Sequence, residues 1–140
     1  MIRTSVGKNI LPKGHFIGSG AWTVPQRFKE AGFETHLIFC GLTNVTKSIQ
    51  RVDIRFKKGG FHVPPLDIGN NFHGNMEMLN KQFAIFDSKE IIDTSNNQII
   101  PVCSLLDGRA YTPLSDEDLP EWFKSGMPNI YALLTPQQPL

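Results

Sequence analysis

Four cationic side chains recur at intervals of four, four and three residues, which places them on one row of a predicted helix: Lys47, Arg51, Arg55 and Lys58. The glycine pair Gly59-Gly60 and then His62 follow closely. The planar fork of arginine matches the oxygens of a phosphate, and two arginines one helical turn apart can hold neighbouring oxygens. The row therefore predicts a polyphosphate clamp, in which the glycines let the segment close and His62 donates to the anion.

The same stretch also has a simpler interpretation. Its apolar residues define the buried side of the helix at spacings of four, three and four: Val45, Ile49, Val52 and Phe56. The cations lie beside this stripe, and rows of charge on a helix are most often a solvated face. A single histidine such as His62 is more often a surface or packed residue than a ligand. Periodicity by itself leaves the clamp and the solvated face open.

The elements that must position this row indicate an α/β fold. The apolar run 35–40 predicts a parallel strand covered on both faces, and a helix over 45–58 follows it. A longer helix begins after Pro64-Pro65, and 90–93 is expected to be a strand. Asp107-Gly108 between two extended runs predicts an antiparallel hairpin. We therefore expect a parallel sheet flanked by helices, with a C-terminal antiparallel hairpin.

Four segments resemble, in the same order, motifs of the zeta-toxin-like P-loop kinases. Residues 51–64 resemble the paired arginines and diglycine-histidine of that family, and 32–42 resemble the strand that precedes them. Residues 71–75 are similar to a Gly-Asn helix motif, and 91–95 are similar to an Asp-x-Ser strand end. The resemblance covers roughly residues 14–123, and the order and spacing of the segments are more specific than any one of them.

The resemblance implies a partial P-loop kinase-like parallel sheet and ATP-dependent phosphoryl transfer to a small molecule. A nucleotide-activated amino sugar is one candidate acceptor, and ATP and Mg²⁺ are the implied cofactors. Arg51 and Arg55 match the family's catalytic lid arginines. The matching nucleotide-binding positions are Lys58, Gly59, Gly60 and His62, and the chain matches no metal ligands. An antitoxin-like protein, or a chain that completes the sheet, is the implied partner.

The phosphate-binding loop GxxxxGK[ST] of that family has no counterpart here. Gly7-Lys8 is followed by Asn9 instead of a hydroxyl residue, and Ile2 stands where the first glycine belongs. Gly14 and Asn71 stand where the family has glutamate and arginine. We therefore expect transfer only if the loop comes from a longer reading frame or a second chain. The alternative is a non-catalytic remnant or a protein-interaction module that keeps the kinase-like fold.

Length and composition suit one domain of 140 residues with a net charge of +1, which gives no global attraction to nucleic acid. We expect an irregular segment at 1–13, a kinase-like domain at 14–123 that opens with a short strand at 15–17, and a Pro-containing tail at 124–140. No apolar run is long enough for a membrane span, so a cytoplasmic protein is expected. Cys40 and Cys103 lie in apolar runs and are expected to be buried, reduced thiols.

Overall fold

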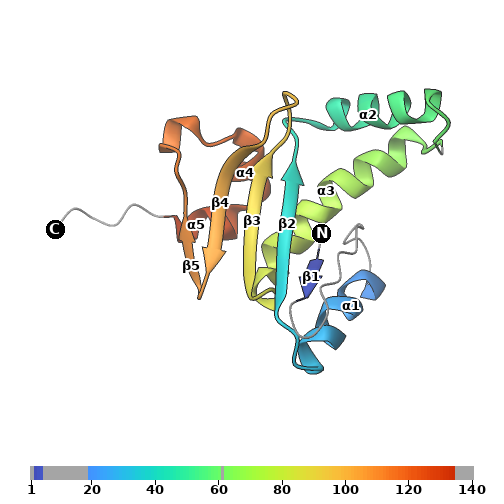
Figure 1. The fold of residues 1–140 in the computed structure, drawn as a ribbon. Helices are drawn as coiled ribbons and strands as arrows, with labels where there is room; N and C mark the ends of the chain where they lie inside the picture. The colour runs from blue at the N-terminus through green and yellow to red at the C-terminus, as the bar shows by residue number, and fades with distance from the viewer. Residues whose placement is uncertain (1, 5–18, 61, 135–140) are drawn as a thin grey trace.

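Among the residues that the structure describes, five strands form one mixed sheet, in which they follow one another in chain order (Figure 1). The computed structural model describes residues 2–4, 19–60 and 62–134, so the strand expected at 15–17 lies outside it. The strands are β1 (Ile2–Thr4), β2 (Thr35–Gly41), β3 (Ser88–Asp93), β4 (Ile100–Leu106) and β5 (Arg109–Tyr111). Of these described strands only β2 and β3 are parallel to each other, and every other neighbouring pair is antiparallel. The α/β class is confirmed, but the expected parallel sheet is limited to this one pair.

The helices account for most of the remaining described chain. They are α1 (Ser19–Glu30), α2 (Val45–Lys57), α3 (Pro65–Gln82), α4 (Glu121–Gly126) and α5 (Pro128–Leu133), with short 3₁₀ turns η1 (Phe83–Ile85) and η2 (Asp116–Asp118). The chain crosses from β2 to β3 through α2 and α3, and α2 extends beyond the end of the sheet (Figure 1). None of the helices within the described ranges has the length and apolar character needed to cross a membrane.

Glycines in the left-handed region end both α1 and α2, with φ of 91° at Gly32 and 99° at Gly59. In α2 the Gly59 N–H donates to the Phe56 carbonyl over 3.0 Å, and the Gly60 N–H donates to the Arg55 carbonyl over 2.8 Å. This pair of bonds is a Schellman cap. A Cβ on Gly60 would lie 2.9 Å from the Arg55 carbonyl oxygen. The diglycine therefore ends α2, directly after the residues 45–58 over which the sequence predicted a helix.

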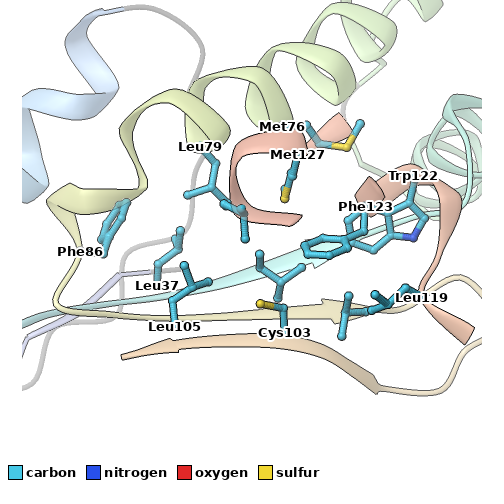
Figure 2. Packing of buried hydrophobic residues seen from close by; sticks show 13 residues of the cluster. Leu37, Met76, Leu79, Phe86, Cys103, Leu105, Leu119, Trp122, Phe123 and Met127 are labelled. Atoms are coloured by element: carbon cyan, nitrogen blue, oxygen red, sulfur yellow. The ribbon is translucent and has the colours of Figure 1, made fainter. Parts of the chain in front are cut away.

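The hydrophobic core lies between one face of the sheet and the helices α3, α4 and α5 (Figure 2). Leu37, Ile91 and Leu105 contribute from neighbouring strands, and Leu79 and Phe123 cover them from α3 and α4. Each of these side chains is at most 2% exposed. Three strands and three helices thus share one continuous core.

The segment after residue 123, expected to be a tail, is part of this core up to Leu134. Met127 and Ile130 are both fully buried. The Asn80 side chain accepts hydrogen bonds from the backbone N–H of Asn129 at 2.8 Å and of Ile130 at 3.4 Å. The buried Asn80 of α3 thereby satisfies two free donors in the first turn of α5.

Within the described ranges, the side chains on the other face of the sheet are exposed or half-buried, which corrects the expectation that β2 is covered on both sides. Ile38 is 38% exposed and the Cys40 thiol is exposed, whereas Cys103 on the covered face is buried. The apolar run alone could not reveal this, because the helix that follows β2 extends past the sheet instead of folding over it. At the edge of β2, residues 2–4 form β1 where irregular chain was expected.

Candidate functional site

The carboxyl ends of β2 and β3 meet at one edge of the sheet, where Gly41 pairs with Asp93. Ligands of open α/β sheets bind outside the carboxyl ends of parallel strands. The loops that leave these ends are joined by hydrogen bonds. The Thr94 N–H donates to the Gly41 carbonyl at 3.0 Å, and the Thr43 N–H donates to Ser95 Oγ at 2.8 Å. The two loops therefore form one connected surface.

Lys47 and Arg51 reach back from α2 to this surface. Helix α2 begins after Asn44, whose side-chain oxygen accepts from the Lys47 N–H at 3.0 Å. Lys47 Nζ donates to the Ser95 carbonyl at 3.1 Å. Arg51 Nη1 donates to Thr94 Oγ1 at 3.2 Å, and its Nη2 donates to the Thr94 carbonyl. Both cations are half-buried and donate to main-chain carbonyl groups just after the end of β3.

Asp93 is the buried acid of this edge. Trp122 Nε1 donates to its Oδ2 at 2.8 Å, and the Ser95 N–H donates to its Oδ1 at 2.7 Å. Burial by itself raises the pKa of the Asp93 carboxyl, but these hydrogen bonds and the charge of Lys47 together hold that pKa below its usual value. The indole lies directly against Gly41, where a Cβ would be 2.1 Å from Trp122 Cη2. Asp93 therefore has a structural role, with both oxygens occupied.

We call these side chains the strand-end cluster: Thr43, Lys47, Arg51, Asp93, Thr94, Ser95 and Trp122. Sequence reasoning identified Lys47 and Arg51 but assigned no role to the others. The Asp-Thr-Ser run at the end of β3 was visible as a similarity to a strand-end motif. The sequence around Trp122 did not indicate its place in the cluster, because its partner Asp93 lies 29 residues earlier in the chain.

The other expected site residues lie outside the cluster. Arg55 and Lys58 are exposed, and the side chains of both lack hydrogen bonds and ion pairs to the described residues. Arg55 follows Arg51 by one turn, about 6 Å along the helix axis. The exposed His62 places its ring edge-on to Phe56, with 5.2 Å between centroids. The structure thus brings Lys47 and Arg51 together and leaves the rest of the row in solvent.

The apolar stripe of α2 is also less buried than its spacing predicted. No residue of this helix is buried, and Phe56 is 46% exposed. Helix α2 packs mainly on α3, where a Cβ on Gly69 would meet Val45 at 3.7 Å. A helix whose partner is one other helix covers only part of its stripe. The cations of the row therefore belong to a helix that is only lightly packed against the rest of the protein.

The two implied cofactors, ATP and Mg²⁺, differ in how well the described residues suit them. The solvent-facing guanidinium of Arg55 and ammonium of Lys58, which lie farther along α2 than the strand-end cluster, suit phosphate oxygens. For Mg²⁺, the described part of the chain holds no cluster of three or more His, Cys, Asp or Glu, and each oxygen of Asp93 already accepts one hydrogen bond. The arrangement can bind an anion, and we derive no step that uses a metal.

Comparison of the chain with protein families, with curated proteins and with solved structures found no match.

Proposed function

We propose that this chain binds the phosphates of a nucleotide and serves as the lid part of a zeta-toxin-like phosphotransferase. In that reaction ATP is the phosphoryl donor and a small molecule is the acceptor. The observation that carries the proposal is the position of the cationic row. It starts at the carboxyl ends of the only parallel strand pair among the described strands and continues into solvent along α2.

Each cation has a distinct part in this proposal. Arg51 and Lys47 are held by carbonyl groups of residues 94 and 95, so they fix the start of α2 against the sheet. Arg55 and Lys58 carry their charge into solvent and are the groups that contact phosphate. Arg51 keeps its remaining N–H groups for an anion at the same edge, since arginine has five donors. His62 and the diglycine shape the end of the helix and need not touch the nucleotide.

The test measures phosphate affinity with matched variants. Isothermal titration with Mg-ATP and with inorganic tripolyphosphate should detect binding, and Arg55→Ala should weaken it about tenfold, the effect of about 1.4 kcal/mol from a charge-assisted bond. Lys57→Ala is the control, because Lys57 is on the same helix but pairs with Asp53 at 3.0 Å. Equal losses in the two variants would mean only general attraction to a basic helix.

Two further readouts separate the steps of the proposal. Tighter binding of Mg-ATP than of tripolyphosphate supports nucleotide recognition, whereas equal binding restricts the site to an anion. Absence of binding by both ligands at low salt refutes the proposal, since screening is weakest there.

The alternative is a non-catalytic module that keeps the fold. One observation favours it: both terminal nitrogens of Arg51 are committed to Thr94, so the residue expected to steady a transferred phosphoryl group is partly used by the fold. Under this alternative Mg-ATP leaves the melting temperature unchanged. A shift that disappears in Arg55→Ala would exclude it.

A further inference from the structure

The open face of the sheet has a defined composition, because strand register fixes which residues share it. Cross-strand pairing runs through β2, β3, β4 and β5 and aligns the outward residues in three rows. These rows, which we call the open face, are His36, Ser88, Leu106 and Arg109; then Ile38, Glu90, Ser104 and Tyr111; then Cys40, Ile92 and Pro101. All eleven are exposed or half-buried.

Large apolar side chains lie on this face. Leu106 is 53% exposed, Tyr111 is 54% exposed and Ile38 is 38% exposed. Leu106 and Tyr111 lie on neighbouring strands in neighbouring rows, and Ile38 lies across the face beside Cys40 and Ile92, with Glu90 and Ser104 between the two groups. Contiguous exposed apolar patches rimmed by polar residues mark interaction sites.

The charges of the open face are self-complementary. It carries one acid, Glu90, and one permanent cation, Arg109, which stand two strands and one row apart. With strands about 4.8 Å apart and rows about 7 Å apart, the separation is about 12 Å. Neither side chain forms an ion pair with another residue of the described ranges. In a two-fold contact every residue pairing occurs twice, so Glu90 of each copy can meet Arg109 of the other.

We propose that two copies of this chain associate through their open faces, with Glu90 and Arg109 paired reciprocally. The contact covers the apolar patch and neutralises both charges. Three rows across four strands span roughly 300–400 Å² in projection, below the about 800 Å² per partner of a standard interface. The dimer is therefore weak, with a dissociation constant of about micromolar or higher. This inference uses no residue of α2 and does not depend on nucleotide binding.

Charge exchange tests the pairing directly in the full chain. Sedimentation equilibrium from about 1 µM to about 1 mM should show reversible dimerisation, weaker at high salt. Glu90→Arg and Arg109→Glu should each raise the dissociation constant about tenfold or more, because like charges then meet twice. The double variant E90R/R109E should restore the dimer. Restoration is expected only if the two residues meet across a two-fold axis.

The controls keep the proposal falsifiable. Both positions are exposed, so the melting temperature of each variant should match the original chain, and Lys57→Glu on α2 should leave association unchanged. A chain that stays monomeric throughout the range, as expected if a different protein covers this face, overturns the proposal. Failure of the double variant to dimerise also overturns it.

Discussion

Replacing Gly41 by alanine should destabilise the protein, because the added Cβ would clash with the indole of Trp122. The added Cβ would lie 2.1 Å from Cη2 and 2.4 Å from Cζ2 of Trp122, far inside van der Waals contact. Gly41 is not one of the described residues with a positive φ, so its backbone conformation is one that alanine can adopt. The indole must therefore move, and Trp122 is only 6% exposed with little room to do so.

The cost has two parts. Overpacking of a core costs about 1–3 kcal/mol. Displacement of the indole also breaks its 2.8 Å hydrogen bond to the Asp93 carboxylate, and bonds to charged groups contribute about 1.5–3 kcal/mol. We expect a loss of about 3–5 kcal/mol in the free energy of unfolding, a large share of the roughly 5–15 kcal/mol of a typical domain.

Urea denaturation followed by circular dichroism measures this loss. Gly69→Ala is the matched control, since its Cβ would meet only Val45 at an ordinary 3.7 Å and should stabilise α3 by about 0.5–1 kcal/mol. Trp122→Phe should remove the clash, so its cost and that of Gly41→Ala should not add. If Gly41→Ala lowers the free energy of unfolding by less than about 1 kcal/mol, this account of the strand ends is refuted.

Two other predictions concern titratable groups of the sheet. The pKa of Asp93 is held below its usual value, so its contribution to stability is complete above the unfolded pKa of about 4 and is lost as pH falls through the lower folded pKa. Asp93→Asn should abolish this acid-side loss in unfolding measured from about pH 6 to pH 2, and an unchanged slope would contradict it. Burial raises the pKa of the Cys103 thiol to about 11, while Cys40 is exposed. Ellman's reagent should therefore modify one thiol in the native protein and a second only after denaturation; equal native rates would be inconsistent with the core described above.

Elements set by neighbouring residues were predictable from the sequence. The hairpin turn is an example, since Asp107 and Gly108 both have positive φ, at 53° and 73°. Gly59 likewise ends α2 as its type and position indicated. These features depend on local backbone energetics, which residue type largely determines.

Features that depend on distant partners were not predictable. Burial of Ile130 follows from packing in which Asn80, 50 residues earlier, accepts its N–H. The engagement of Arg51 depends on Thr94, 43 residues later. An apolar run such as that of β2 reports which side chains tolerate burial, but the coverage of each face depends on where the connecting helices pack.

The absence of buried residues in α2 has a consequence for how the protein fluctuates. A helix with so little buried apolar surface can open without unfolding the sheet, so its amide hydrogens exchange faster than those of β3 and β4. An anion held by Arg55 and Lys58 would slow this local exchange, because binding requires the ordered helix. Ligand affinity and helix order are then one coupled equilibrium, in which part of the binding free energy appears as protection of α2.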